Sequence, residues 1–196
     1  MPCPVREKYP EVFSEADSIA RECPVEMGGP GNVDLLYWLA EHREVREAVE
    51  TGVAFGWSSL ALLLSMQHRA SARLYSSDMP YPERENDAYV GCVVPAHLRT
   101  FWQVLRYADR DAIPRALRDL GGTIDLCHYD SDKSYEGRMW AYPLLWRALR
   151  PGGFFISDDI SDNVAFRDFA AALDLESHVV ETDGKYVGLL VKPPGD

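Results

Sequence analysis

Two acidic clusters and a lysine in the second half of the chain have the residue types needed for proton transfer and cation binding. Asp130 precedes Lys133 by three residues, and Asp158 and Asp159 stand together further along. Each cluster follows an apolar, strand-like segment. Because the carboxyl ends of parallel strands lie at one edge of a sheet, we expect these side chains to converge. Converging carboxylates repel one another, so a positive charge is expected among them.

A divalent cation is one source of that charge. Asp130, Asp158 and Asp159 offer the oxygen ligands that Mg²⁺ prefers. In the alternative reading no metal binds, and acidic and hydroxyl side chains nearby cap the helices that follow. Asp158 and Asp159 are also adjacent strand residues, which point to opposite faces unless the backbone bends.

Lys133 is the candidate base. A free lysine has a pKa of about 10.4 and is charged at neutral pH. Desolvation or a nearby metal would lower this pKa and make Lys133 a proton acceptor. A salt bridge to Asp130 or Asp159 would raise the pKa instead.

A glycine-bearing turn in the first half of the chain has the spacing of a ligand loop. Glu50, Gly52, Gly56 and Ser58 lie where a strand is expected to meet a helix, and Asp78 ends the next strand. Glycines there permit a close approach of a ligand to the backbone, and an acid at the second strand end can accept hydrogen bonds from ribose. The spacing matches neither a dinucleotide fingerprint nor a P-loop. Taken alone, the turn is equally consistent with a ligand-free connection.

These residues need a framework of strands alternating with helices. The pattern predicts strands at residues 45–51, 72–77, 101–106, 123–129 and 154–157, and helices at 57–67, 111–120, 135–149 and 163–173. Pro143 should kink or restart the third of these helices. Residues 177–181 and 186–191 flank Asp183 and Gly184 as an antiparallel hairpin. We therefore expect an α/β fold with a doubly wound, mostly parallel, seven-stranded Rossmann-like sheet and a terminal antiparallel hairpin strand.

The remaining segments are expected to cover the site. Residues 1–44 hold two expected helices, at 14–22 and 34–42, and form an N-terminal helical cap, whereas residues 45–196 form the ligand-binding domain. Residues 79–96 form a long irregular connection of the kind that often closes over a site. Trp57, Tyr81 and Tyr89 are aromatic candidates for the wall.

Composition limits the partners. The chain has 196 residues and a formal net charge of −11, which disfavours the phosphate contacts of nucleic-acid binding. It holds no apolar run of the roughly 20 residues that a membrane span needs, and its start lacks the plan of a signal peptide. We expect a cytoplasmic protein with a small-molecule substrate, no nucleic-acid partner and no membrane partner, and we leave a homodimer open.

Taken together, residues 45–191 resemble the class I S-adenosylmethionine-dependent methyltransferases, and within them the small-molecule branch of catechol and macrolide-sugar O-methyltransferases. Four features carry the resemblance: residues 49–59, Asp78, residues 124–136 and residues 149–160. The last two motifs together are fairly specific.

The resemblance implies roles for individual residues. The first motif would contact the methionine part of S-adenosylmethionine, Asp78 would bind its ribose, and Asp109 is our choice for the adenine contact. In metal-dependent relatives, acids at the positions of Asp130, Asp158 and Asp159 hold Mg²⁺. Many relatives carry histidine where this chain has Lys133, although catechol-type enzymes use a lysine there to deprotonate the hydroxyl. The cofactor-binding set is Glu50, Gly52, Gly56, Ser58, Asp78, Asp109 and Asp130.

The expected activity is methyl transfer to a hydroxyl of a small molecule, with Lys133 and Asp130 as the catalytic pair and with or without Mg²⁺. One alternative is a metal-independent N- or C-methyltransferase. Another is a homologue that binds the cofactor without catalysis. A nicotinamide oxidoreductase is disfavoured because no pyrophosphate-binding loop is evident.

Overall fold

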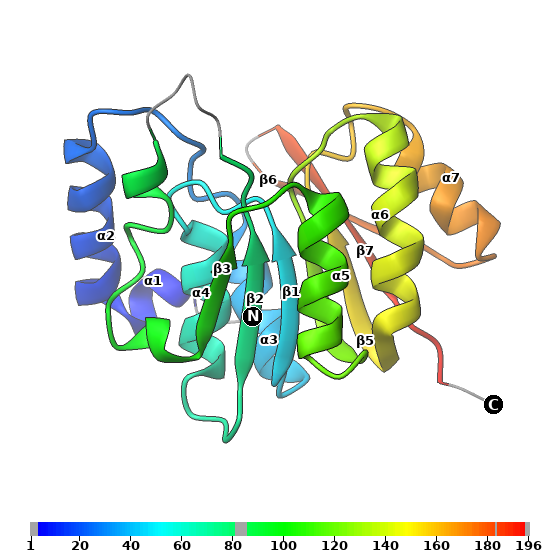
Figure 1. Cartoon of the computed structure of the whole chain (residues 1–196), viewed down its shortest axis with the longest axis horizontal. Helices are drawn as coiled ribbons and strands as arrows, with labels where there is room; N and C mark the ends of the chain where they lie inside the picture. Colours follow the sequence, from blue (N-terminus) through cyan, green and yellow to red (C-terminus); the bar gives the residue numbers. More distant parts are fainter. Residues whose placement is uncertain (1–3, 81–85, 183, 195–196) are drawn as a thin grey trace.

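A seven-stranded sheet forms the centre of the protein (Figure 1). The computed structural model describes residues 4–80, 86–182 and 184–194. The strands are β1 (Glu47–Thr51), β2 (Arg73–Ser77), β3 (Trp102–Leu105), β4 (Ile124–Tyr129), β5 (Leu149–Ser157), β6 (His178–Thr182) and β7 (Lys185–Val191). Their order is β3-β2-β1-β4-β5-β7-β6.

The sheet is mostly parallel. Strands β1 to β5 pair in parallel, whereas β7 runs antiparallel to β5 and β6 antiparallel to β7. This confirms the doubly wound, Rossmann-like sheet with a terminal antiparallel hairpin. Gly184 follows β6 with φ +76°, and Asp183 of the expected turn lies outside the described residues. The order reverses between β1 and β4, the place where such sheets bind ligands.

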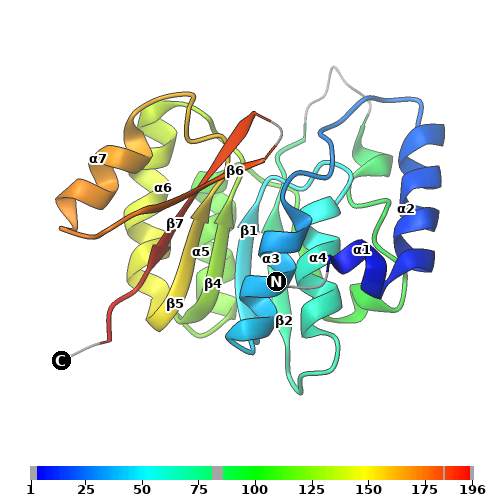
Figure 2. The same cartoon turned by 180° about the vertical axis from the view of Figure 1, so that it is seen from behind.

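Helices cover both faces of the sheet (Figures 1 and 2). Helices α1 to α4 lie on one face and α5 to α7 on the other, with two short 3-10 helices between β2 and β3. The helices are α1 (Val5–Lys8), α2 (Pro10–Glu22), α3 (Val33–His42), α4 (Trp57–Met66), α5 (Asp109–Asp119), α6 (Tyr135–Ala148), α7 (Ala165–Ala172), η1 (Asp87–Tyr89) and η2 (Leu98–Phe101).

Each face of the sheet has its own apolar core. Helix α4 is buried almost all round, including Leu60 and Leu63, because it lies between the sheet and α3. A helix that is apolar on every side needs such an enclosed position. On the other face, the rings of Tyr142, Phe155 and Phe169 contact one another. The two cores fix the strand ends that carry the polar residues.

The structure departs from the prediction most clearly at helices α2 and α6 and at strand β5. Helix α2 begins at Pro10, a residue suited to the first helical position, rather than at residue 14. Helix α6 is one helix that includes Pro143 rather than two. Strand β5 starts at Leu149 instead of 154, because Gly152 and Gly153 exchange backbone hydrogen bonds with Lys192 after β7. Residues 150–153 thus extend the strand rather than only ending the helix before it.

The N-terminal helices pack on the sheet-forming part. Val5 of α1 and Phe13 of α2 are buried in the same apolar core as α4, and the Phe13 ring stacks on Trp57 with centroids 6.3 Å apart. The division into a cap and a ligand-binding domain remains a proposal. Among the described residues, no helix combines the length and apolar composition needed to cross a bilayer.

Candidate functional site

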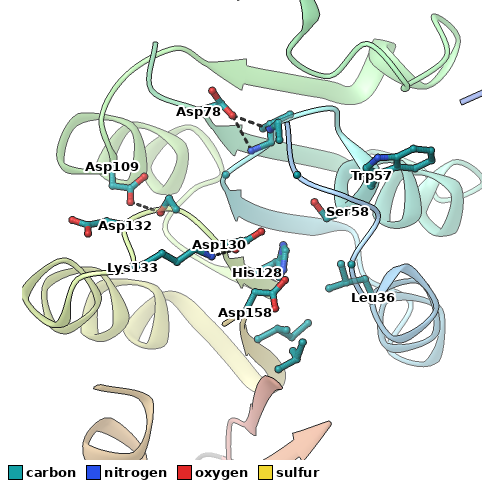
Figure 3. A pocket seen from close by; sticks show the side chains of 18 of the residues that line it. Leu36, Trp57, Ser58, Asp78, Asp109, His128, Asp130, Asp132, Lys133 and Asp158 are labelled. Carbon is teal, nitrogen blue, oxygen red and sulfur yellow. Dashed lines mark hydrogen bonds and ion pairs between the residues drawn. The ribbon is translucent and has the colours of Figure 1, made fainter. Parts of the chain in front are cut away.

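A cavity of about 630 Å³ opens at the carboxyl ends of β1, β2, β4 and β5 (Figure 3). It is lined by the glycine loop after β1, by the segments after β2 and β4, and by residues 28–32 ahead of α3. The predicted residues that line it are Gly52, Ser58, Asp78, Asp109, Asp130, Lys133 and Asp158, together with Trp57 of the proposed wall. Tyr81 of that wall lies outside the described residues.

The two glycines of the loop are required by their surroundings. Gly52 has φ +80°, and a Cβ there would lie 2.2 Å from the carbonyl oxygen of Asp130. Gly56 has φ +95°, and its Cβ would lie 2.9 Å from the Cα of Gly91. Residues other than glycine rarely adopt these positive φ values. The loop is therefore held in close contact with the start of the β4–α6 connection and with the segment after η1.

Ser58 lines the cavity, and its side chain does not cap α4. Gly56 occupies the N-cap position of this helix, and no side chain accepts a hydrogen bond from its first turn. The Ser58 hydroxyl is therefore available to a ligand near the positive end of the helix dipole.

Asp78 ties the glycine loop to the second strand. Its Oδ2 accepts hydrogen bonds of 3.0 Å from the backbone N–H groups of Val53 and Ala54. Its Oδ1 forms an ion pair with Arg106, which also pairs with Asp87 of η1. One carboxylate thus orders the loop and connects it to the segment between β2 and β3.

Asp109 lies at the start of α5, on the far side of the same cavity from the N-terminal helices. Its carboxylate accepts hydrogen bonds from the hydroxyls of Ser77 (3.1 Å) and Ser131. Burial raises the pKa of Asp109 in spite of these two hydrogen bonds. Next to it, the guanidinium of Arg110 lies 4.9 Å from the ring centroid of Trp140, and both residues line the cavity.

Glu50 is fully buried and is not among the cavity-lining residues. Its Oε2 accepts hydrogen bonds from Ser59 and from Ser76, the latter at 2.7 Å. Its Oε1 lies 3.6 Å from Nδ1 of His128, a residue that does line the cavity. Glu50 is therefore separated from the cavity, and His128 stands in front of it.

Sequence reasoning missed His128. It lies two residues before Asp130 on β4, and strand alternation places both on the same face of the sheet, so the signal was present. Burial alone would lower the pKa of His128, but the nearby charge of Glu50 outweighs it and raises this pKa. The cavity floor thus carries an imidazole beside the carboxylates (Figure 3).

Lys133 and two carboxylates form a charged cluster at the ends of β4 and β5. The lysine Nζ contacts Oδ1 of Asp130 and lies 3.0 Å from Oδ2 of Asp159. Burial acts to lower the pKa of Lys133, but the two carboxylates more than offset it and raise this pKa. Burial of Asp159 is likewise outweighed by Lys133, which lowers the pKa of Asp159. In this arrangement the lysine is a charged ammonium at neutral pH.

Asp158 and Asp159 point to different partners. Oδ1 of Asp158 accepts a hydrogen bond of 2.9 Å from the backbone N–H of Asp159, and Asp158 faces the cavity. Asp159 adopts φ +48° and directs its carboxylate to Lys133. The buried guanidinium of Arg138, which the sequence did not reveal as functional, donates to the carbonyl oxygens of Asp158 and Asp159. This hydrogen bonding holds the bend that the strand pattern required.

The three carboxylates of the predicted magnesium site do not form a ligand set in this arrangement. Within residues 4–80, 86–182 and 184–194, no group of three acidic, histidine or cysteine side chains is placed to hold a metal ion. The Lys133 ammonium takes the position between Asp130 and Asp159. The donor set as it stands fits an ammonium rather than a divalent cation, and the magnesium ion remains a prediction.

The sequence matches a known protein family. A family model described as a methyltransferase domain matches residues 49–160, which is more than half of the chain. No curated protein matches the sequence.

Solved structures match over nearly the whole chain. An O-methyltransferase from Bacillus cereus in complex with SAH is 16% identical, with a TM-score of 0.67 over 93% of this chain and 90% of that one. TomG from Streptomyces achromogenes, an O-methyltransferase involved in tomaymycin synthesis and solved with SAM, is 21% identical, with a TM-score of 0.61 over 93% and 90%. Cofactor-bound Rv0187 from MTB is 19% identical, with a TM-score of 0.67 over 93% and 88%. At these identities the likeness establishes a shared fold.

Proposed function

Because this chain belongs to the methyltransferase domain family, we propose that it transfers the methyl group of S-adenosylmethionine to a hydroxyl of a small molecule. One observation carries the proposal: the cavity lined by the glycine loop and Asp78 is also lined by Asp130 and Lys133, which follow β4. A loop suited to the cofactor and a proton-transfer pair therefore share one enclosed space. SAM or SAH in two of the structurally similar O-methyltransferases supports this assignment.

We assign the cofactor along the length of the cavity. Asp78 would accept hydrogen bonds from the ribose, since Oδ1 keeps a free lone pair beside Arg106. Asp109 and the Arg110–Trp140 pair would flank the adenine. Ser58 and the backbone at Gly52 would face the methionine part, with Asp130 opposite. Gly56 does not line the cavity and would act by shaping the loop. Glu50 is buried away from the cavity and receives no direct cofactor contact.

The bound cofactor supplies an electrophilic methyl group on its sulfonium. The protein must then orient the acceptor oxygen and take its proton. We propose that Lys133 is the proton acceptor and that Asp130 positions it. Its two carboxylate partners raise the pKa of Lys133, so the lysine is protonated at neutral pH. It must lose this proton before it can accept one from the substrate. Activity should therefore rise with pH.

No catalytic step is assigned to a metal ion. The position of the Lys133 ammonium between Asp130 and Asp159 supports the metal-free reading of the acidic cluster over the magnesium reading. Methylation of N or C without a metal stays a second candidate, because the position of the Lys133 ammonium does not distinguish an oxygen acceptor from a nitrogen or carbon acceptor.

The N-terminal helices supply the cover over the acceptor side. Residues 28–32 line the cavity, and Asn32 at the start of α3 donates a hydrogen bond of 3.0 Å to Thr182 of β6. Leu35 and Leu36 of α3 and Ile156 of β5 add apolar surface. We propose that the substrate is a small, partly apolar hydroxyl compound enclosed between this segment and the β6–β7 hairpin.

A transfer assay tests the proposed function. The protein is incubated with S-adenosylmethionine labelled in its methyl group and with a panel of phenols, sugars and amines, and SAH formation is measured. We expect turnover with hydroxyl compounds and loss of turnover in Lys133→Ala. Turnover with amines alone, or labelled product that carries no methyl ether, would contradict oxygen methylation.

A further inference from the structure

A chain of polar side chains crosses the apolar core beneath the cavity. It starts at Trp102 of β3 and passes through Ser76 of β2 and Glu50 of β1 to His128 of β4. Ser76 and Glu50 are register partners on neighbouring strands, as are Glu50 and His128, so these three side chains lie on one face of the sheet. The proposed chemistry leaves this chain without a role.

The direction of every hydrogen bond in the chain is fixed. The indole Nε1 of Trp102 can only donate, and it donates to Oγ of Ser76 at 2.8 Å. The Ser76 hydroxyl must then donate its own hydrogen to Oε2 of Glu50, 2.7 Å away. Ser59 of α4 donates to the same oxygen. Oε2 of Glu50 is thereby satisfied from two sides.

The other carboxylate oxygen has no such partner. Oε1 of Glu50 and Nδ1 of His128 are both buried without a hydrogen bond, and they face each other at 3.6 Å. A buried carboxylate oxygen needs a donor, and a small shift of the His128 ring supplies it. Glu50 therefore fixes the orientation of the His128 imidazole, and His128 lines the cavity.

The position of His128 in the cavity indicates which part of the cofactor it would contact. His128 lies on the cavity floor between the glycine loop of β1 and the Asp130 end of β4, with Asp158 beside it (Figure 3). Asp78 and Asp109, assigned to the ribose and adenine, lie on other elements, at the end of β2 and the start of α5. The part of the cofactor that remains for this floor is its α-amino-acid group.

We propose that His128 is a cofactor-contact residue that hydrogen-bonds the α-amino-acid group of S-adenosylmethionine, and that Glu50 is the positioning residue that orients it. This inference rests on the proposed function, because it presupposes that cofactor. It gives Glu50 an indirect part in cofactor binding.

Two ligands that differ in this group provide the test. SAH carries the α-amino-acid group, whereas 5′-methylthioadenosine keeps the adenosine and sulfur but lacks it. Calorimetric titration of each ligand into the wild-type protein and His128→Gln gives four dissociation constants. We expect His128→Gln to weaken SAH binding by about tenfold, the size of a lost hydrogen bond to a charged group, and to leave 5′-methylthioadenosine binding unchanged within about twofold.

Two further variants complete the design. Glu50→Gln keeps an acceptor for the serines but turns an amide donor toward Nδ1 of His128, so we expect a smaller loss in the same direction. His68→Gln, at an exposed histidine elsewhere, should bind both ligands like the wild type. Unchanged 5′-methylthioadenosine binding in a variant shows that its adenosine site is folded.

The outcomes distinguish a failure of the role of His128 from a failure of the proposed function. Equal losses for both ligands, or no loss for either, would overturn the role of His128 while leaving the proposed function intact. An altered KM for the acceptor with unchanged SAH binding would also overturn it and assign His128 to the substrate instead. Failure of the wild-type protein to bind SAH would remove the proposed function and this inference together.

Discussion

The ammonium of Lys133 lies 3.0 Å from Oδ2 of Asp159, across the adjacent ends of β4 and β5. The same ammonium contacts Asp130, so one positive charge joins the two acidic strand ends. The left-handed backbone of Asp159 and the hydrogen bonds from Arg138 make this contact possible. The chemistry of the site therefore depends on how tightly Lys133 is held.

Removing the lysine tests its catalytic role. Lys133→Ala should lower kcat by about 10²–10⁴-fold, the usual contribution of a positioned proton acceptor. SAH binding should change little, because Lys133 is proposed to act on the acceptor. Steady-state kinetics and calorimetry on the same preparation measure both quantities. Wild-type turnover in the variant would eliminate Lys133 as the base.

The pH dependence of activity follows from the raised pKa of Lys133. The base must lose its proton to act, so kcat should climb with pH and stay below its plateau at neutral pH. Asp159→Asn removes one of the two charges that raise this pKa. The rising limb of the pH–rate profile should then shift to lower pH. A shift to higher pH, or an unchanged limb, would show that Lys133 does not set the profile.

The same raised pKa has a consequence for stability. A lysine whose pKa is higher in the folded state stabilises the fold below its unfolded pKa, and this contribution is lost as the pH rises through the folded pKa. The contribution of the cluster should therefore be intact at neutral pH and decline only in strongly alkaline solution. Thermal melts of the wild type and Lys133→Met across that range measure the difference, which should narrow as the pH rises.

Metal removal distinguishes the two readings of the acidic cluster. Since the Lys133 ammonium already lies between Asp130 and Asp159, we expect turnover to persist after dialysis against EDTA. Addition of Mg²⁺ should leave the rate within about twofold, because a divalent cation would have to displace the ammonium. Loss of activity in EDTA with recovery in Mg²⁺ would instead support Asp130, Asp158 and Asp159 as a ligand set.

The glycine loop can be tested through stability. Gly52→Ala places a Cβ against the carbonyl of Asp130 at a positive φ, and Gly121→Ala has the same φ of +80° with open space around it. We expect Gly121→Ala to cost about 1–2 kcal/mol from backbone strain and Gly52→Ala to cost more. Denaturant unfolding compares the two. Equal costs would mean that the loop yields without effect on its neighbour.

Much of this architecture follows from the sequence, for identifiable reasons. Buried runs such as residues 124–129 and the polar residues at their ends are typical of a doubly wound sheet. The ends of elements were less accessible: β5 extends back to Leu149 because it pairs with residues after β7, a contact distant in sequence.

The site likewise has features that the sequence predicts and features that depend on contacts between distant elements. The convergence of Asp130 and Lys133 with Asp159 could be predicted from strand ends. The left-handed conformation of Asp159 could not, since it depends on Arg138 from another element. His128 was predictable from strand alternation. The burial of Glu50 behind it was not, because it depends on hydrogen bonds from Ser59 and Ser76 on other elements.

Calorimetric titration of SAH into the wild-type protein and into Asp78→Asn is the most direct test of the central claim, that this cavity binds S-adenosylmethionine. We predict one site per chain in the wild type. We also predict at least a tenfold weaker affinity in Asp78→Asn, roughly the effect of losing a charged ribose acceptor that also orders the glycine loop. An absence of binding in the wild type, or equal affinity in the two proteins, would contradict the account.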